Sequence, residues 1–127
     1  MLRGFMTFVG AAYIVLALWC AIMPAQTAES VGYKLQPGSG QSEYFVLYGG
    51  LQMALGLAFL WPWFRPQDLS FLNALTLCLI VHGTIVLFRT VSFGMYKGIG
   101  STTMILAGVE WAIFLVSVGI AFTARKG

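Results

Sequence analysis

The chain has 127 residues, of which 59% are hydrophobic and only 9% are charged, and its net charge at pH 7 is +3. A soluble globular domain carries about 25% charged residues, so this chain has too little polar surface to cover a water-soluble fold. The basic residues are scattered and mostly flank apolar segments, which excludes a nucleic-acid-binding patch and carries information about membrane orientation instead. The composition therefore predicts a small integral membrane protein.

Four continuous apolar segments follow one another, each close to the ~20 residues that a helix needs to span the hydrocarbon core. They cover residues 4–23, 43–61, 69–91 and 102–124. Runs without strand-like alternation indicate helices, since only helices and closed barrels satisfy their backbone in lipid. We predict that residues 1–127 form a single all-α domain, an integral membrane bundle of four transmembrane helices with antiparallel up-and-down connectivity.

The first segment has some features of a secretory signal peptide, because Arg3 precedes it and small residues follow Pro24. Its apolar run is longer than a typical signal core, so we interpret it as the first membrane helix. Cys20 and Cys78 lie inside apolar segments at different depths, which predicts buried thiols rather than a disulfide.

The connections between the segments differ in kind. Residues 24–42 are predicted to form a long polar loop, residues 62–68 a tight turn between two prolines, and residues 92–101 a glycine-containing loop. Four spans place both termini on one side of the membrane. That side holds most of the basic residues outside the spans: Arg3, Arg65, Arg125 and Lys126. The positive-inside bias therefore favours cytoplasmic termini.

Small residues recur every fourth position on the second and fourth predicted helices: Gly50, Ala54 and Ala58, with Gly49 beside them, and Gly108 with Ala112. Residues of this size let helix backbones approach closely in a membrane. The pattern favours packing within the bundle, and the alternative is a contact with another protein.

Glu110 stands in the middle of an apolar stretch, where a carboxylate is costly unless it is paired or protonated. At a rise of 1.5 Å per residue, it lies roughly 10 to 12 Å from the outer end of its helix. Arg89 lies near the outer end of the third helix, and its long side chain can reach Glu110, Glu43 or both.

Tyr48 on the second helix and His82 on the third lie in the same half of the bilayer as this group. We therefore predict a polar pocket between the helices, open towards the outside. Two interpretations remain open: a buried ion-pair network that fixes helix register, and a site that binds a ligand or handles protons.

His82 is most simply a hydrogen-bonded interior group. It is the single histidine of the chain, so a haem held by two of its own histidines is excluded. A metal site would need His82 together with Glu110 and Cys78, and we expect neither a metal nor another cofactor.

The run from Glu43 to Gly50, which ends in Tyr48-Gly49-Gly50, resembles a signature of a bacterial family of small four-helix membrane proteins, domain-of-unknown-function family 4345. Pro24, Arg89 and Glu110 occupy positions where that family tends to have a helix-ending proline, a late arginine and an acid. Phe45 departs from the family, whose members often carry an arginine there, so Arg89 must serve alone. The resemblance implies a four-helix fold and a bacterial inner-membrane address, with both termini in the cytoplasm by the charge argument above. It implies no established activity.

The sequence contains no serine–histidine–acid constellation, phosphate-binding glycine loop or CxxC pair. We therefore predict a non-catalytic protein that acts as an accessory subunit of a larger membrane complex or homo-oligomer, or binds a lipid or quinone in the polar pocket. The alternative is a membrane-embedded, isomerase-like enzyme in which Glu43 or Glu110 acts as general acid/base on an isoprenoid or sterol-like substrate. A proton or ion carrier is disfavoured because the polar groups occupy one half of the bilayer.

Overall fold

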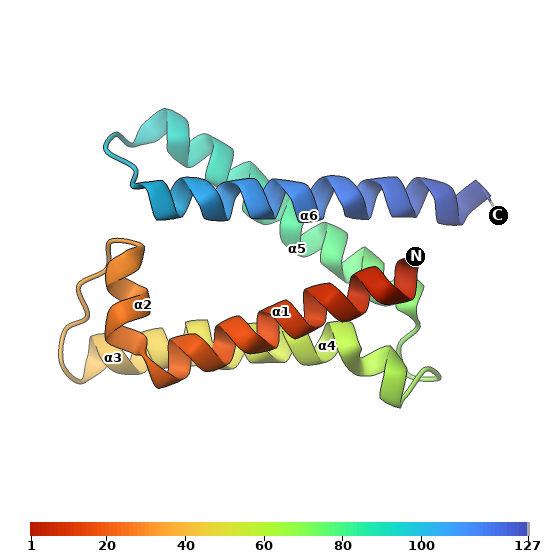
Figure 1. Ribbon diagram of the computed structural model, residues 1–127, viewed down its shortest axis with the longest axis horizontal. Helices are drawn as coiled ribbons and strands as arrows, with labels where there is room; N and C mark the ends of the chain where they lie inside the picture. Colours follow the sequence, from red (N-terminus) through yellow and green to blue (C-terminus); the bar gives the residue numbers. More distant parts are fainter. Residues whose placement is uncertain (127) are drawn as a thin grey trace.

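The computed structural model describes residues 1–126, and the side chains of residues 1–124 (Figure 1). Across that described range the secondary structure consists of helices joined by turns and loops, without strands. The helices are α1 (Leu2–Ile22), α2 (Pro24–Ser30), α3 (Ser39–Tyr44), the π-helix η1 (Phe45–Leu51), α4 (Gln52–Phe64), α5 (Phe71–Met95) and α6 (Ser101–Lys126). Four stretches are long and apolar enough to cross a membrane: Leu2–Ile22, Ser39–Phe64, Phe71–Met95 and Ser101–Ala124. The predicted all-α class with four such helices is confirmed.

The boundaries of the first two predicted segments need correction. The predicted loop at residues 24–42 contains α2 and the start of α3. Pro24 begins α2 as well as following α1, because proline fits the first turn of a helix, where its missing N–H is not needed. Pro62 does not end the second long helix, which continues to Phe64. A proline so close to a helix end removes one backbone hydrogen bond without stopping the last turn.

The later two helices begin close to their predicted starts. Ser70 caps α5, where its hydroxyl oxygen accepts a hydrogen bond from the Asn73 backbone N–H at 3.2 Å. This bond satisfies one of the unpaired donors of the first turn and places the helix start. α5 extends to Met95, four residues beyond the predicted end at residue 91.

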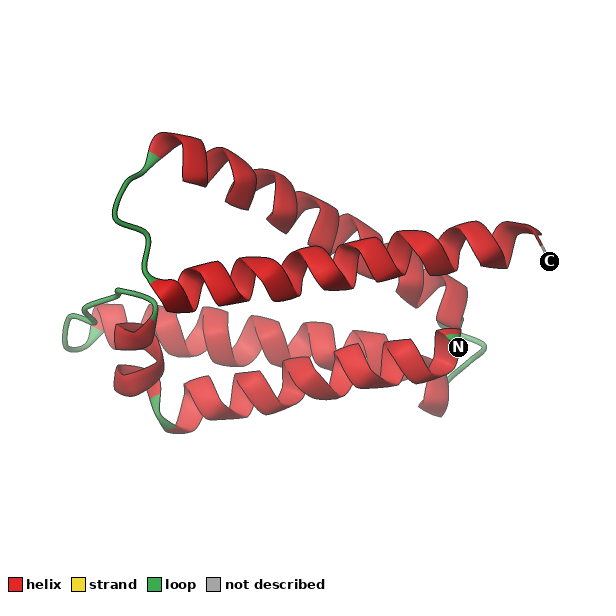
Figure 2. Cartoon of the chain, turned by 45° about the horizontal axis from the view of Figure 1, so that its top comes forward, coloured by secondary structure: helices red, strands yellow, loops and turns green. Residues whose placement is uncertain are grey.

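The four long helices form two pairs. α1 lies along the helix formed by η1 and α4, and α5 packs along α6. α5 also contacts α1 and α4, whereas α6 makes its main contacts with α5. Figures 1 and 2 show α5 crossing obliquely between α6 and the α1–α4 pair, with both ends of the described chain at the same end of the molecule.

An apolar core joins the two pairs at the end that carries the termini. Its buried residues come from the four long helices: Met6, Val9, Phe59, Ala74, Leu75, Cys78 and Ile120. A second buried cluster, Cys20, Ala28 and Tyr44, holds α2 against the α1–α4 pair at the opposite end and does not involve α5 or α6. The pairs are therefore held together by apolar packing at one end of the molecule.

The closest helix contact is between α1 and α4, and it uses two glycines. A Cβ atom added to Gly10 would lie 3.1 Å from the Gly56 carbonyl oxygen, and one added to Gly56 would lie 2.9 Å from the Gly10 carbonyl oxygen. These backbones pack so closely that a side chain has no room between them, as small-residue contacts in membranes allow.

The small residues predicted to pack within the bundle mostly do not. Gly49 is buried, with space for a Cβ 3.4 Å from that of Ala21, and Ala58 is half-buried. The other four, Gly50, Ala54, Gly108 and Ala112, are exposed on the outer surface. The prediction of internal packing is wrong for these four, because four-residue spacing defines a helix face but not the direction in which that face points.

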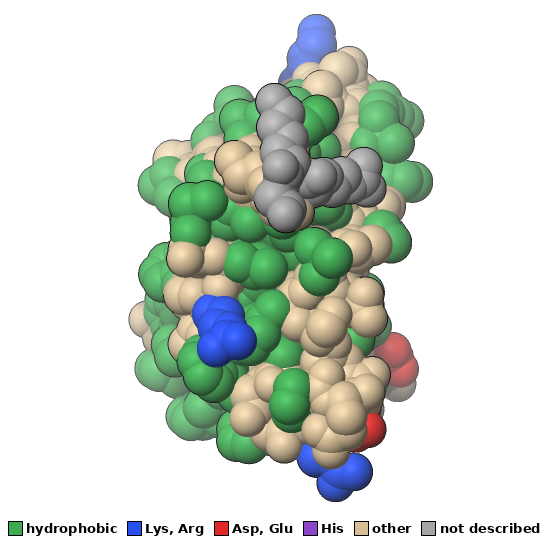
Figure 3. All heavy atoms as spheres, turned by 90° about the vertical axis from the view of Figure 1, so that its right-hand side faces the viewer, with side chains coloured by type: hydrophobic (Ala, Val, Ile, Leu, Met, Phe, Trp, Pro, Cys, Tyr) green, Lys and Arg blue, Asp and Glu red, His purple; other side chains and the backbone are tan. Residues whose placement is uncertain are grey.

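The outer surface of the bundle is strongly apolar. Exposed large hydrophobic side chains are spread over all the long helices and include Phe8 at 67%, Ile22 at 76% and Phe88 at 71% exposure. Figure 3, which looks onto the end where the chain begins, shows hydrophobic side chains over much of this face, with a few separate basic and acidic groups. Apolar patches of this extent mark a surface that is covered by another apolar phase or protein.

We expect Gly56→Ala to destabilise the α1–α4 contact, because its methyl group would overlap the Gly10 carbonyl oxygen. Overpacking of this kind costs about 1–3 kcal/mol. Thermal unfolding of the detergent-purified protein, followed by tryptophan fluorescence, measures the effect. Gly108→Ala is the control, since a Cβ there meets nothing within 4 Å. Equal unfolding temperatures for the two variants would contradict this account of the contact.

Candidate functional site

A cavity of about 570 Å³ lies between the two helix pairs and borders the apolar core that joins them. α1, the segment after α2, the helix from η1 into α4, α5 and α6 all contribute to its walls. Aliphatic side chains form most of the lining. The polar residues that line it are Tyr13, Tyr33, Tyr48, Gln52, His82, Arg89, Thr103 and Glu110. Of the five residues predicted for the pocket, four lie here, and Glu43 does not.

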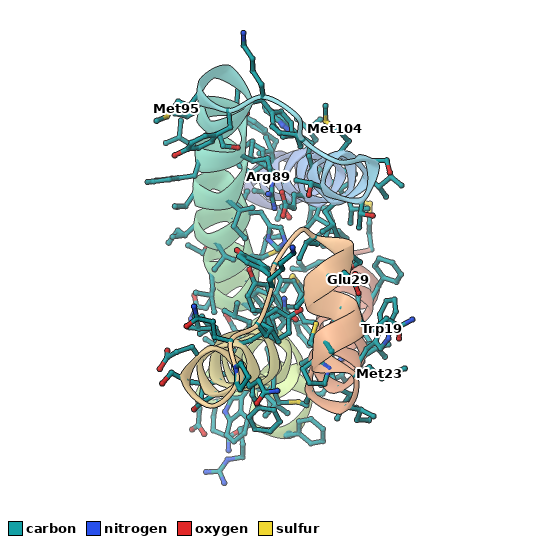
Figure 4. The ribbon with its side chains drawn as sticks, turned by 90° about the vertical axis from the view of Figure 1, so that its left-hand side faces the viewer. Trp19, Met23, Glu29, Arg89, Met95 and Met104 are labelled. Atoms are coloured by element: carbon teal, nitrogen blue, oxygen red, sulfur yellow. The ribbon has the colours of Figure 1, made fainter. Side chains whose placement is uncertain are left out.

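Arg89 and Glu110 form a two-pronged ion pair between α5 and α6. Arg89 Nε donates to Glu110 Oε2 at 2.9 Å, and Arg89 Nη2 donates to Glu110 Oε1 at 2.7 Å. The side chains are 28% and 19% exposed, so the pair is sheltered but open to the cavity. Figure 4 shows Arg89 in the space between α5, α6 and the α2 segment. Parallel paired hydrogen bonds of this kind are strong and fix the geometry of both groups.

Glu43 lies outside this network. It is exposed on α3 and takes no part in the ion pairs found in residues 1–124. Its side chain does not line the cavity that Tyr48, Arg89 and Glu110 share. The prediction that Arg89 could pair with Glu43 is therefore wrong, and Arg89 pairs with Glu110 instead.

Tyr48 belongs to a cluster of three tyrosines that ties α2 and the segment after it to the second long helix. Its ring stacks on that of Tyr44, with centroids 4.4 Å apart, and its hydroxyl donates to the Tyr33 hydroxyl at 3.1 Å. Tyr44 in turn donates to Thr27 Oγ1 at 3.1 Å. The cluster thus ties α2 and the segment after it to the second long helix, and it leaves Tyr33 and Tyr48 along the cavity wall.

Tyr48, Gly49 and Gly50 lie within the π-helix η1. π-helical turns are rare and occur most often at functional sites, because the wider turn displaces side chains from their α-helical positions. Two adjacent glycines lower the preference of this segment for the α-helix. The predicted signature residues therefore coincide with an irregular turn that borders the cavity.

His82 sits where the cavity meets the apolar core, and it is 1% exposed. Its Nδ1 atom lies 3.0 Å from the Cys78 carbonyl oxygen, and its Nε2 atom lies 3.2 Å from the Tyr13 hydroxyl. Because a carbonyl oxygen can only accept, Nδ1 carries the proton, and in the neutral ring Nε2 accepts from the Tyr13 O–H. The prediction that His82 is an interior, hydrogen-bonded group is confirmed.

This histidine also connects three helices. Cys78 Sγ lies 3.4 Å from His82 Nδ1 and 3.5 Å from Ser117 Oγ, so Tyr13 on α1, His82 and Cys78 on α5, and Ser117 on α6 form one buried polar chain. Within the described residues, no group of three His, Cys, Asp or Glu side chains is placed to hold a metal ion.

The sequence did not single out Tyr13, Tyr33 or Gln52. Gln52 had a usable signal, since it follows Tyr48 by four residues on an apolar helix and shares its face. Tyr13 and Tyr33 had none, because aromatic residues near membrane interfaces are common and the second of them lies outside regular structure.

Comparison with known proteins gave no match to a family model, to a curated protein or to a solved structure. The resemblance noted in the sequence therefore stays a prediction, and the site has to be interpreted from its own chemistry.

The cavity combines apolar and polar surfaces. The cavity has apolar walls that suit a hydrocarbon chain, and a group of hydroxyl, amide and guanidinium functions that suit a polar headgroup. Apolar pockets with a few convergent polar groups are typical of small-molecule sites.

Breaking the ion pair should destabilise the protein strongly. We expect Arg89→Ala to lower the free energy of unfolding by about 3 kcal/mol, because it leaves the Glu110 carboxylate sheltered and unpaired. The double variant Arg89→Met/Glu110→Met should recover most of this loss, since it removes both charges. Chemical unfolding in detergent provides the measurement.

Glu43→Gln serves as the control, because Glu43 is exposed and lies outside the pair. A double variant no more stable than Arg89→Ala would show that the destabilisation comes from lost packing rather than from an uncompensated charge.

Proposed function

We propose that the protein is a multi-pass membrane protein whose four long helices cross the bilayer in alternating directions. Three observations support this: the length and hydropathy of the helices, the apolar outer surface, and the position of both ends of the described chain at one end of the bundle. The bacterial inner membrane is the address that the family resemblance implies.

The distribution of charge supports cytoplasmic termini. Arg3 and Arg65 lie at the end with the termini, and Arg125 and Lys126, whose side chains lie outside the described residues, follow in the last turn of α6. At the other end, Lys34 and Lys97 are balanced by Glu29 and Glu43. Excess basic residues on one side favour that side in the cytoplasm.

Within this membrane protein, we propose a non-catalytic binding function: the cavity between the helix pairs holds one amphiphilic molecule, a lipid or a quinone. The observation that carries the proposal is the cavity of about 570 Å³, whose walls combine aliphatic side chains with the Arg89–Glu110 pair. Three tyrosines also line it: Tyr13, Tyr33 and Tyr48. A ligand would place its headgroup at the ion pair and the tyrosines, and its hydrocarbon chain along the aliphatic wall.

The same geometry gives less support to the enzyme alternative. Glu110 borders the cavity, but both of its carboxylate oxygens already accept hydrogen bonds from Arg89. A general base has to accept a proton from the substrate with one of these oxygens. Each oxygen keeps a second lone pair, but a proton gained by Glu110 would cancel the charge that partners Arg89 in this sheltered site. Glu43, the other candidate, lies outside the cavity.

An accessory role in a larger complex or a homo-oligomer is compatible with ligand binding. Gly50 and Ala54 on one face, and Gly108 and Ala112 on another, are exposed to the surroundings of the bundle. Small residues at such positions let a helix of another chain approach closely. They support, as part of the proposal, a contact outside the bundle.

Filling the cavity should remove the ligand. We expect Ile85→Trp, which adds a large ring to the cavity wall, to abolish co-purification of lipid or quinone as detected by native mass spectrometry from mild detergent. Ile80→Trp is the matched control on the same helix, because Ile80 is 62% exposed and does not line the cavity. If neither the unmodified protein nor the control retains a lipid or quinone, or if Ile85→Trp retains as much, the binding function is wrong.

Site-specific labelling tests the orientation. In a variant with both native cysteines replaced by alanine, a membrane-impermeant maleimide added to spheroplasts should label a cysteine at Ser39 and fail to label one at Asp68. These residues lie at opposite ends of the bundle, next to the starts of the second and third long helices. Labelling of Asp68→Cys alone would show that the topology is the reverse of the proposed one, and equal labelling of both positions would contradict membrane insertion.

A further inference from the structure

The charges that line the cavity balance. Arg89 and Glu110 are the two charged residues among its described lining, and they neutralise each other. His82 uses both ring nitrogens in hydrogen bonds within the protein, Nδ1 with Cys78 and Nε2 with Tyr13. A phosphate or carboxylate headgroup would add a negative charge without a partner, which is strongly unfavourable away from water. The cavity therefore suits an uncharged headgroup.

Hydrogen-bond donors remain available at the polar end. Two of the five N–H groups of Arg89 are used by Glu110, and the other three have no acceptor among residues 1–124. The Tyr33 hydroxyl accepts from Tyr48, and its own proton has no acceptor in the same range. These donors call for an oxygen atom on the ligand.

An acceptor is also left over. The Gln52 side chain lines the cavity, and its Oε1 atom is buried without a hydrogen-bond partner among the described residues. A buried acceptor without a donor is costly. The last torsion of a glutamine side chain turns over a broad range, so rotation of the amide can turn its oxygen towards the cavity. A ligand that only accepts hydrogen bonds, such as a quinone or an ether, leaves this oxygen unpaired.

A hydroxyl group both donates and accepts, so it can pair with Arg89 or Tyr33 as acceptor and with Gln52 as donor. We infer that the cavity binds an uncharged lipid with a hydroxyl headgroup, that is, a long-chain alcohol or a comparable neutral hydroxylated lipid. This inference rests on the proposed binding function and narrows its ligand from amphiphiles in general to one headgroup class.

Three probes that share one alkyl chain distinguish the possible headgroups: hexadecanol, hexadecyl methyl ether and hexadecyl phosphate. The ether removes the donor and keeps the oxygen, and the phosphate adds negative charge. Apparent dissociation constants for the full chain come from native mass spectrometry titrations in one detergent. We expect hexadecanol to bind on the order of tenfold more tightly than the ether, the value of about one good hydrogen bond, and more tightly than the phosphate.

Gln52→Leu should reduce the preference for hexadecanol over the ether to about onefold, since the hydrogen-bond partner of the hydroxyl proton is lost. Binding of the ether should change little and the unfolding temperature should not fall, which separates loss of recognition from loss of fold. Gln67→Leu, in the exposed turn between α4 and α5, is the matched control and should keep the preference of the unmodified protein.

Equal binding of hexadecanol and the ether, or tightest binding of the phosphate, would overturn the inference while leaving the binding function intact, provided that Ile85→Trp still blocks the probes. Failure of all three probes to bind, or binding that Ile85→Trp leaves unchanged, would overturn the binding function and this inference together. A preference that survives Gln52→Leu would also overturn the inference, because the hydroxyl would then be recognised elsewhere.

Discussion

The ion pair between Arg89 and Glu110 is the interaction on which the arrangement of the second helix pair depends. α6 makes its main contacts with α5, so the shift of these two helices along each other decides where α6 lies. Two parallel hydrogen bonds, 2.9 and 2.7 Å long, accept little displacement along the helix axis. In this sheltered site each charge requires the other, and the pair therefore helps to set the register of α5 against α6.

That register also determines what lies in the space between the pairs. The apolar core joins all four long helices at the end with the termini, and the buried polar chain through Tyr13, His82 and Ser117 marks where this core stops. Beyond it, the α1–α4 pair is closed by its own cluster around Tyr44, which does not reach α5 or α6. The cavity lies where no apolar cluster joins the two helix pairs, and the ion pair forms part of its wall.

The ion pair thus has a structural role that needs no ligand, and it shapes a site that can hold one. An unpaired carboxylate in such a cavity would be a candidate base, whereas protonation of a carboxylate that is paired with an arginine leaves the arginine without its counter-charge. The remaining guanidinium N–H groups, the tyrosine hydroxyls and Gln52 offer hydrogen bonds without net charge. This combination is the physical basis for proposing recognition rather than catalysis in the cavity.

Sequence by itself determined the helical class and the four long apolar helices, and it named Arg89 as a partner for Glu110, Glu43 or both, because the cost of an exposed backbone or an unpaired charge in lipid leaves few alternatives. It placed His82 correctly as an interior group for the same reason. Between the two acids, the structure decided for Glu110. Only the tertiary structure decided which helix faces point inwards. Glu43 and the small residues Gly50 and Gly108 proved to face outwards, while Gly10, Gly56, Tyr13 and Gln52 proved to face the interior. A helical period identifies residues that share a face, but the rotation of each helix about its axis is set by packing against the others, and that information is spread over the whole fold.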